Sequence, residues 1–274
     1  MSKVYFSVLI PVYVKETPSY FNKALESITL QSLLPDEIVI VADGPLSKEL
    51  DEVINIYTKQ FPDIFNIIRL PKNMGMGVAM NTGLKNCKYE WVARMDSDDI
   101  ARTNRFEKQI KYIEEHPEID VLGSFAEEFI SEIGDFAKIR VLPTSHQDIL
   151  RFTKKRCPIN HMTVMYRRTK AIEAGGYWEN RIFEDYNLWY QMLKRSCRFA
   201  NLPNVLIDVR VGNNLVDRRR GLSYFRQEFN FFKQMRNEGF INVINFITVV
   251  SVRFISRILP KFILEKIYYL LLRR

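Results

Sequence analysis

Cysteine is scarce in this chain: only Cys87, Cys157 and Cys197 occur among 274 residues, and they lie far apart. No pair has the short spacing of a metal-binding or redox motif. An odd and sparse set favours a reducing compartment over a disulfide-stabilised fold. The first residues, MSKVYFSVLIPVY, lack the length and the cleavage site of a secretory signal. We therefore expect residues 4–10 to form the first strand of a cytosolic domain.

Several ligand-binding patterns are also missing. The sequence has no GxxxxGK[ST] phosphate loop, and its MGMG piece at residues 74–77 is not a GxGxxG fingerprint. The glycine and glutamate spacing of an EF-hand is absent as well. No internal repeat, low-complexity stretch or Gly/Ser linker divides the chain. The length fits one large domain with a short appendage.

Charge is distributed unevenly. The net charge is +8 at pH 7, but the segment from Arg210 to the end holds thirteen lysines and arginines against four acidic residues. The preceding residues are therefore close to neutral. A basic and apolar tail indicates an anionic surface as partner. We expect a membrane surface with anionic lipid, and no nucleic acid, because the tail is also rich in aliphatic and aromatic residues.

The apolar runs of the tail are too short to cross a bilayer. Residues 240–252 hold no charge, but thirteen residues fall short of the ~20 that a spanning helix needs. Basic residues among Phe, Ile, Leu and Tyr are typical of amphipathic helices that lie in the membrane interface. The alternative is that these helices pack on the rest of the chain.

The first hundred residues alternate apolar runs with helical patterns. The runs at 4–10, 37–41, 66–70 and 91–95 are separated by apolar residues at helical spacing. This predicts an α/β fold with a Rossmann-like, mostly parallel sheet flanked by helices. Ligands bind such sheets beyond the carboxyl ends of strands. Polar clusters at 13–16, 43–44 and 96–99 follow three of the predicted strands.

The second half of the chain is less regular. Apolar spacing predicts helices at 104–116 and 183–194 and strands at 121–125, 136–141 and 161–166. We expect a main domain over residues 1–220 and an amphipathic helical tail over residues 221–274.

The richest polar cluster is Asp96-Ser97-Asp98-Asp99, directly after a predicted strand. Three neighbouring carboxylates repel one another, and a hard divalent cation such as Mn²⁺ or Mg²⁺ relieves that repulsion. Such an ion can bridge a diphosphate and stabilise a leaving nucleoside diphosphate. Arg94 and Arg102 lie close by and suit either phosphate contact or charge balance. The alternative is that the aspartates cap the helix that follows.

These pieces together resemble the family 2 glycosyltransferases of the GT-A fold. The resemblance runs from Ser7 to about Arg220 and rests on SVLIPVY, QSLLPDEIVIVADGP, LPKNMGMGVAMNTGL, RMDSDD and FEDYNLWYQML in that order. DVRVGNNLVDRRRG and the C-terminal ILPKFILEKIYYLLLR further resemble bacterial enzymes that build surface polysaccharides, including O-antigen and capsule. The resemblance implies a nucleotide-binding half over about residues 1–100 and an acceptor half over about residues 101–220.

The resemblance also implies roles for individual residues. Asp43 would accept a hydrogen bond from the base, and Asp98 and Asp99 would hold the metal ion. His161, at the start of a predicted strand, suits contact with the diphosphate, completion of the metal shell or a hydrogen-bonded structural role, and this assignment rests on its position rather than on the resemblance. The full set of implied donor-binding residues is Pro11, Tyr13, Glu16, Asp43, Asn73, Asn81, Arg94 and Asp96.

Asp185 is implied as the general base. An acceptor hydroxyl must lose a proton as it attacks the anomeric carbon, and a carboxylate at a helix N-terminus remains ionised and can take it. A single displacement inverts the anomeric centre. The alternative is that Glu184-Asp185 simply favours the first helical turn. Trp178 suits either stacking on acceptor sugar or core packing, and Arg218-Arg219-Arg220 suit either a diphosphate or solvent.

The expected function is transfer of a hexose, glucose or galactose rather than an N-acetyl form, from a UDP-sugar to a lipid-linked sugar acceptor. The resemblance suggests a β1,3 link to N-acetylhexosamine on diphosphoundecaprenol, at the cytoplasmic face of a bacterial inner membrane. A sugar-1-phosphate nucleotidyltransferase is a second hypothesis, although PVYVKETP is not its Gly-rich, Arg-containing loop. A third is an inactive carbohydrate-binding scaffold on the membrane.

Overall fold

A computed structural model describes residues 3–179, 182–212 and 221–258 of the chain. The chain divides into two compact units, residues 1–211 and residues 212–274. The boundary predicted from the sequence lies later, at residue 220. The two units are described separately below.

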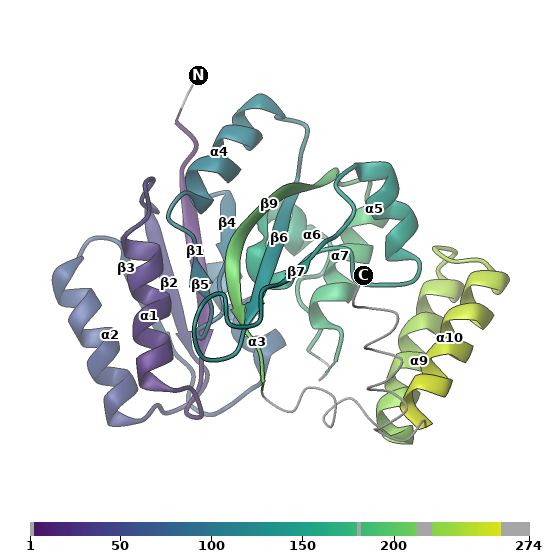
Figure 1. Cartoon of the computed structure of the whole chain (residues 1–274), viewed down its shortest axis with the longest axis horizontal. Coiled ribbons are helices and arrows are strands. Elements are labelled where there is room, and N and C mark those ends of the chain that lie inside the picture. Colours follow the sequence, from purple (N-terminus) through teal and green to yellow (C-terminus); the bar gives the residue numbers. More distant parts are fainter. Residues whose placement is uncertain (1–2, 180–181, 213–220, 259–274) are drawn as a thin grey trace. The chain divides into compact units, whose positions relative to one another are not determined.

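The first unit begins with alternating strands and helices, as the sequence predicts (Figure 1). The strands β1 and β2 pair in parallel, and β1 also pairs in parallel with β4. The bounds are β1 (Phe6–Val12), α1 (Pro18–Thr29), β2 (Glu37–Ala42), α2 (Lys48–Gln60), β3 (Phe65–Arg69), α3 (Met76–Asn86) and β4 (Trp91–Arg94).

The remainder of the first unit adds shorter elements and one long strand. The sheet order is β3-β2-β1-β4-β8-β6-β9-β5, with β7 paired to β6. The bounds are β5 (Ile100–Ala101), α4 (Arg105–Glu115), β6 (Val121–Phe129), β7 (Lys138–Arg140), α5 (His146–Thr153), β8 (Met165–Arg167), α6 (Arg168–Glu173), α7 (Glu184–Lys194) and β9 (Phe199–Arg210).

One predicted strand begins later than expected, and one strand was not predicted. The strand predicted at 161–166 is a 3-10 turn over His161–Thr163, and the strand begins only at Met165. The unpredicted strand is β9, which pairs in parallel with β6 over nine residues of β6. Pro203 and its neighbouring asparagines interrupt the apolar pattern of β9, and its partner strand lies far away in the sequence.

Alternation along β1 and β2 distributes the core over both faces of the sheet. Val8 and Ile10 belong to the apolar cluster that includes Phe21 and Leu25 of α1. Leu9 and Val41 face the other way, where α3 approaches through Gly83 without a side chain between them. Both faces are covered, so the strands read as continuous apolar runs.

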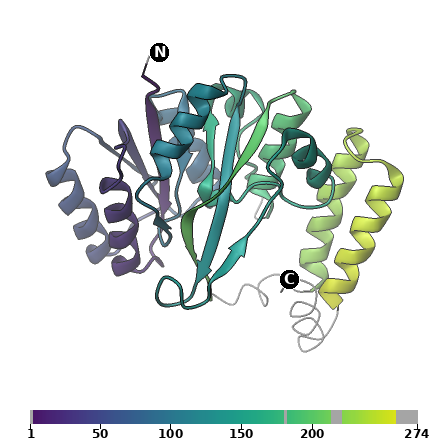
Figure 2. The same ribbon diagram turned by 45° about the horizontal axis from the view of Figure 1, so that its top comes forward.

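The carboxyl ends of β1, β2 and β4 meet at one edge of the sheet, because these strands are parallel and adjacent. The backbone bond from Met95 N to Leu9 O and that from Asp43 N to Val12 O extend the pairing just past the strand ends. The loops after all three strands therefore leave the sheet side by side (Figure 2). This edge carries the polar clusters found in the sequence.

Among its described residues, the second unit has two helices, α9 (Leu222–Asn237) and α10 (Val243–Ile258). Glu228 of α9 is buried and bonds both Arg253 and Arg257 of α10, at 2.5 and 2.8 Å. These two basic residues of the predicted tail thus stabilise the pairing of α9 with α10, and contact of the tail with a membrane stays a prediction. Within the described ranges, no helix has both the length and the hydropathy needed to cross a membrane.

Candidate active site

The three aspartates that follow β4 converge as the sequence predicts. Ligand oxygens of Asp96, Asp98 and Asp99 lie within 4.8 Å of one another. Asp99 is fully buried, and its Oδ1 accepts a hydrogen bond from Arg210 N at 2.9 Å. Its other oxygen, Oδ2, is buried without a donor among the described residues. This oxygen is therefore free to coordinate a cation.

A buried arginine lies beside these carboxylates. Arg94, at the end of β4, is 1% exposed and forms an ion pair with Asp96. Burial lowers the pKa of Arg94, whereas the nearby Asp98, Asp99 and Asp185 raise it. The predicted contact of Arg94 with phosphate stays a prediction, because the structure directs this guanidinium to a carboxylate.

The electrostatics of the cluster suit a divalent cation. Burial, and after it the neighbouring Asp98 carboxylate, raise the pKa of Asp99 to about 7. Burial also raises the pKa of Asp98. Both shifts mean that burial disfavours the ionised forms of these two carboxylates, which a bound cation would favour. Hard oxygen ligands at this spacing fit Mg²⁺ or Mn²⁺.

The loop after β1 reaches the same cluster. Ser97 Oγ donates to Glu16 Oε2, and Glu16 Oε1 accepts from Thr17 N at 2.7 Å. Burial raises the pKa of Glu16. Pro11 is buried within β1, whereas the side chain of Tyr13 is exposed at the strand end. Tyr13 and Glu16, both predicted to bind the donor, thus lie on a loop that contacts the aspartate segment.

Asp43, at the end of β2, holds the loop before α3. Its two carboxylate oxygens accept hydrogen bonds from Met74 N at 2.6 Å and Gly75 N at 3.0 Å. Asp43 is buried, and Asn73 in the same loop is exposed. Base recognition by Asp43 stays a prediction, but the structure adds that this carboxylate fixes the loop that begins α3.

Asp185 lies in the first turn of α7 and is half-buried. Its Oδ1 accepts from Tyr186 N at 2.7 Å, and Cys157 Sγ lies 3.7 Å from its Oδ2. Burial raises the pKa of Asp185, which brings a carboxylate closer to the pKa that a general base needs near neutral pH. The sequence analysis did not identify Cys157 as a neighbour of this residue.

His161 lies in an aromatic environment. Its ring is 5.6 Å from Tyr177 and 6.4 Å from Trp189, between ring centroids. Burial, with a further contribution from Arg94, lowers the pKa of His161 well below its usual value. The imidazole is therefore neutral. His161 is not part of the group formed by the three aspartates, and its metal role stays a prediction.

Arg210 is a residue of this site that the sequence analysis did not identify. Its guanidinium lies 3.7 Å from the ring centre of Tyr20, and its Nε donates to Asp98 O at 3.3 Å. It belongs to the DVRVG tract, which was noted only as a resemblance. The predicted diphosphate-binding residues Arg218-Arg219-Arg220 lie outside the described residues.

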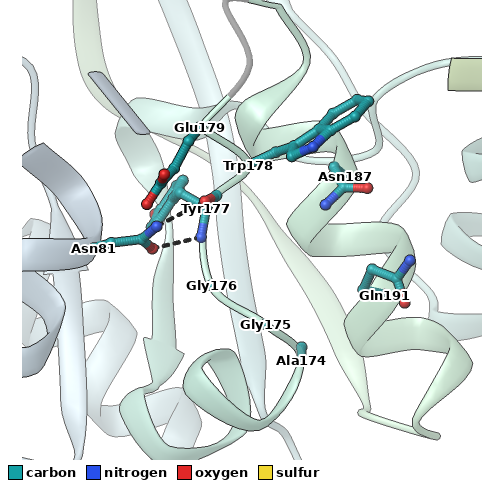
Figure 3. Close-up of a pocket in the computed structure, with 9 residues that line it drawn as sticks. All are labelled: Asn81, Ala174, Gly175, Gly176, Tyr177, Trp178, Glu179, Asn187 and Gln191. Carbon is teal, nitrogen blue, oxygen red and sulfur yellow. Dashed lines mark hydrogen bonds between the residues drawn. The ribbon is translucent and has the colours of Figure 1, made fainter. Parts of the chain in front are cut away.

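Asn81 of α3 clamps the segment that precedes α7. Its Nδ2 donates to Tyr177 O at 2.8 Å, and its Oδ1 accepts from Tyr177 N at 2.7 Å (Figure 3). The approach is so close that a Cβ on Gly176 would lie 2.4 Å from Asn81 Oδ1, and one on Gly77 would lie 2.3 Å from Trp178 O. Asn81, predicted to shape the donor site, thus joins α3 to the segment leading toward Asp185.

The parallel sheet with an aspartate cluster at the end of β4 defines a glycosyltransferase of the GT-A fold. The family model for glycosyl transferase family 2 matches residues 7–176. This chain therefore belongs to the family 2 glycosyltransferases.

Three known proteins illustrate the relationship. The amylovoran biosynthesis glycosyltransferase AmsE of Erwinia amylovora is 40% identical over 96% of this chain and 97% of its own length. UDP-Gal:alpha-D-GlcNAc-diphosphoundecaprenol beta-1,3-galactosyltransferase of Escherichia coli is 35% identical over 98% of this chain and 97% of its own. The mannosyltransferase PcManGT of Pyrobaculum calidifontis, solved with GDP-Man and Mn²⁺, shares the fold, with a TM-score of 0.63, 14% identity and coverage of 92% of this chain and 74% of its own.

The clamp by Asn81 leads to a first prediction. In Asn81→Asp the carboxylate still accepts from Tyr177 N, but it can no longer donate to Tyr177 O and instead repels it. We expect faster hydrogen exchange at the Tyr177 amide and a loss of about 1–3 kcal/mol in the free energy of unfolding. Asn86→Asp on the exposed end of the same helix is the control, because its side chain bonds only within α3. Unaltered exchange at Tyr177 would contradict the clamp.

Proposed function

We propose that this chain is an inverting, metal-dependent hexosyltransferase that moves glucose or galactose from a UDP-sugar to a lipid-linked saccharide. The observation that carries the proposal is the convergence of Asp96, Asp98 and Asp99 at the end of β4, in a family 2 glycosyltransferase. Arg94 interacts electrostatically both with this cluster and with Asp185, which links the metal ligands to the proposed base.

The names of the relatives support a finer proposal for substrates. The Escherichia coli relative acts on UDP-Gal and on an α-D-GlcNAc carried by diphosphoundecaprenol. The Erwinia amylovora relative acts in biosynthesis of amylovoran. By analogy, we take the acceptor to be a diphosphoundecaprenol-linked saccharide whose terminal N-acetylhexosamine receives a β1,3 link during surface polysaccharide assembly.

The chemistry follows from the side chains at the sheet edge. Asp43 and the loop after β1 would hold the nucleoside, and Asp96, Asp98 and Asp99 would hold Mn²⁺ or Mg²⁺. When bound, the ion supplies charge neutralisation for the leaving diphosphate. Asp185 accepts the proton of the acceptor hydroxyl as the new bond between that oxygen and the anomeric carbon forms. The bond between that carbon and the diphosphate breaks on the opposite side, UDP leaves, and the anomeric configuration inverts.

The two alternative functions predict different behaviour toward UDP-sugar. A nucleotidyltransferase would require nucleoside triphosphate and sugar 1-phosphate, and an inactive scaffold would turn over nothing. A transferase hydrolyses UDP-sugar slowly when no acceptor is present, because water replaces the acceptor hydroxyl. This hydrolysis is therefore a test of the proposed function that does not require the acceptor to be known.

The second unit supports peripheral docking on a membrane. Six large apolar side chains of α10 are exposed, among them Ile244 with 74% of its area and Ile247 with 57%. The others are Val243, Val252, Phe254 and Ile255. Burial of such side chains in the interfacial layer would hold the chain near a lipid-linked acceptor. The basic residues at 261, 266, 273 and 274 lie outside the described residues, so charge attraction to anionic lipid remains a sequence-based proposal.

The metal proposal gives a second prediction. Activity should disappear in excess EDTA and return with Mn²⁺ or Mg²⁺. Asp98→Asn should lose most of its activity while its thermal unfolding stays close to that of the parent chain, because the change is isosteric and lies at a polar strand end. Asp63→Asn, at an exposed position, is the control. Full turnover of the parent chain in EDTA would exclude the metal role.

The base proposal gives a third prediction. Asp185→Asn is nearly isosteric but cannot accept a proton, so the rate should fall by roughly 10²-fold or more, with UDP binding retained. The rate of the parent chain should rise with pH through a pKa above the usual aspartate value, because the base must be ionised and burial raises its pKa. Asp148→Asn, also in the first turn of a helix, is the matched control.

If Asp185→Asn instead weakens UDP binding and keeps its turnover at saturation, Asp185 belongs to the donor site. Loss of activity in Asp148→Asn as well would point to a general effect of removing a helical carboxylate.

Membrane docking gives a fourth prediction. Replacing Ile244 and Ile247 by serine should raise the lipid concentration for half-maximal vesicle binding by about tenfold or more, since each buried isoleucine contributes ~1.5–3 kcal/mol. Replacing Leu30 and Ile56 of the first unit by serine should leave vesicle binding unchanged, although these side chains are also apolar and exposed. Co-sedimentation with neutral vesicles measures the contribution of apolar burial, and co-sedimentation with anionic vesicles adds the contribution of charge. Equal binding by all forms would show that α10 is not the docking surface.

A further inference from the structure

A polar pocket lies on α7, away from the proposed base. Its volume is about 450 Å³, and it is formed by α3, the segment at 174–179 and α7 (Figure 3). The side chains that line it with polar groups are Asn81, Trp178, Glu179, Asn187 and Gln191. The roles proposed above for donor, metal and base account for only Asn81 among these residues.

The composition of this pocket fits a sugar ring. Trp178 is half-buried and offers an indole, which combines a flat apolar face with a polar N–H. Asn187 and Gln191 are four residues apart and therefore lie on the same face of α7. Amide side chains both donate and accept hydrogen bonds, as the paired hydroxyls of a pyranose require. The Gln191 amide already donates to Tyr190 Oη at 2.6 Å and accepts from Arg195 Nη1 at 3.4 Å, so bonds to a sugar would add to these or replace them. Gly175 and Gly176 leave the opposite wall without side chains.

Asn187 adds an independent observation. Its Oδ1 is buried, and it has no hydrogen-bond partner within the described part of the chain. Buried polar atoms are nearly always paired, so an unpaired one requires an explanation. Because Asn187 lines the pocket, a hydroxyl group bound there is a donor that would satisfy this oxygen.

The helix geometry separates this pocket from the reacting groups. Residues 185 and 187 point about 200° apart, because each residue of an α-helix turns by ~100°. Asp185 interacts electrostatically with Arg94 in the interior, so Asn187 faces the other flank of α7. A sugar in the pocket is therefore not the sugar whose hydroxyl meets Asp185. Tyr177, whose backbone is held by Asn81, also lines the pocket.

We infer that this pocket is a second saccharide subsite, which binds a neutral pyranose unit of the acceptor next to the unit that is glycosylated. The inference rests on the proposed transferase function. It implies that acceptors with at least two sugar units bind better than acceptors with one. The indole of Trp178 stacks on the ring, and the amides of Asn187 and Gln191 bond its hydroxyls.

The main test compares two synthetic lipid-diphosphate acceptors, one with a single N-acetylhexosamine and one with a disaccharide. The parent chain should have a lower KM for the disaccharide. Gln191→Ala should raise that KM about tenfold, the equivalent of ~1.4 kcal/mol or one good hydrogen bond, with a much smaller change in kcat. The KM for the single-sugar acceptor should change little. Lys194→Ala, on the same helix outside the pocket, is the matched control.

A binding measurement supports the kinetic one. The chain has three tryptophans, and Trp91 and Trp189 are buried. Acrylamide quenching of fluorescence therefore reports mainly on Trp178. Methyl glycosides of hexoses and N-acetylhexosamines, used as free probes, should protect Trp178 from acrylamide, and Asn187→Ala should weaken that protection. Trp178→Phe should abolish the fluorescence that acrylamide can quench, which would confirm that this fluorescence comes from Trp178.

The outcomes separate this inference from the proposed function. Equal KM values for the two acceptors, or protection of Trp178 by UDP but by none of the saccharides, would overturn the subsite. Transfer to the single-sugar acceptor would then still support the proposed transferase. Absence of any UDP-sugar hydrolysis or transfer would overturn the proposed function itself, whereas protection by saccharides alone would leave a binding subsite without that reaction.

Discussion

The arrangement of the active site depends on one buried charge, the guanidinium of Arg94. Three aspartates converge after β4, and carboxylates brought together in a protein interior repel strongly. Asp185, in the first turn of α7, interacts electrostatically with the same arginine. Arg94 forms an ion pair with Asp96. Its positive charge also interacts favourably with the carboxylates of Asp98, Asp99 and Asp185. Arg105 of α4 donates to the Arg94 carbonyl oxygen at 2.7 Å, so the backbone beneath this charge is fixed as well.

The positive charges at this site do not fully offset the burial of its carboxylates. Burial raises the pKa values of Asp98 and Asp99 by more than Arg94 and Arg210 lower them. Burial raises the pKa of Asp185 in the same way. In the proposed metal site, a divalent cation held by the three clustered aspartates would offset part of that penalty. Relief of the penalty would then contribute to the affinity of the proposed site for the ion.

The sequence predicted the parts of the fold that are local. The strands β1 to β4 and their helices follow from apolar periodicity, and the three aspartates are neighbours in the chain. β9 was missed because Pro203 breaks its pattern and because its pairing with β6 is set by distant residues. Arg210 was missed for the same reason: it meets Asp99 across a separation of 111 residues. Nothing near Arg210 in the sequence indicates that meeting.

Counting charges also leaves their pairing open. The excess of basic residues after Arg210 predicts an electrostatic surface, and two of these residues, Arg253 and Arg257, form ion pairs with the buried Glu228. Arg226, Lys233 and Arg236 of α9 are exposed, as are large apolar side chains of α10, so the described part of this unit offers both kinds of side chain to the proposed lipid interface. A net charge limits what a segment attracts at long range, but only the pairing of each charge decides which residues remain available at contact. The proposed membrane docking therefore draws on apolar burial by α10 and on those charges that are not engaged in ion pairs within the unit.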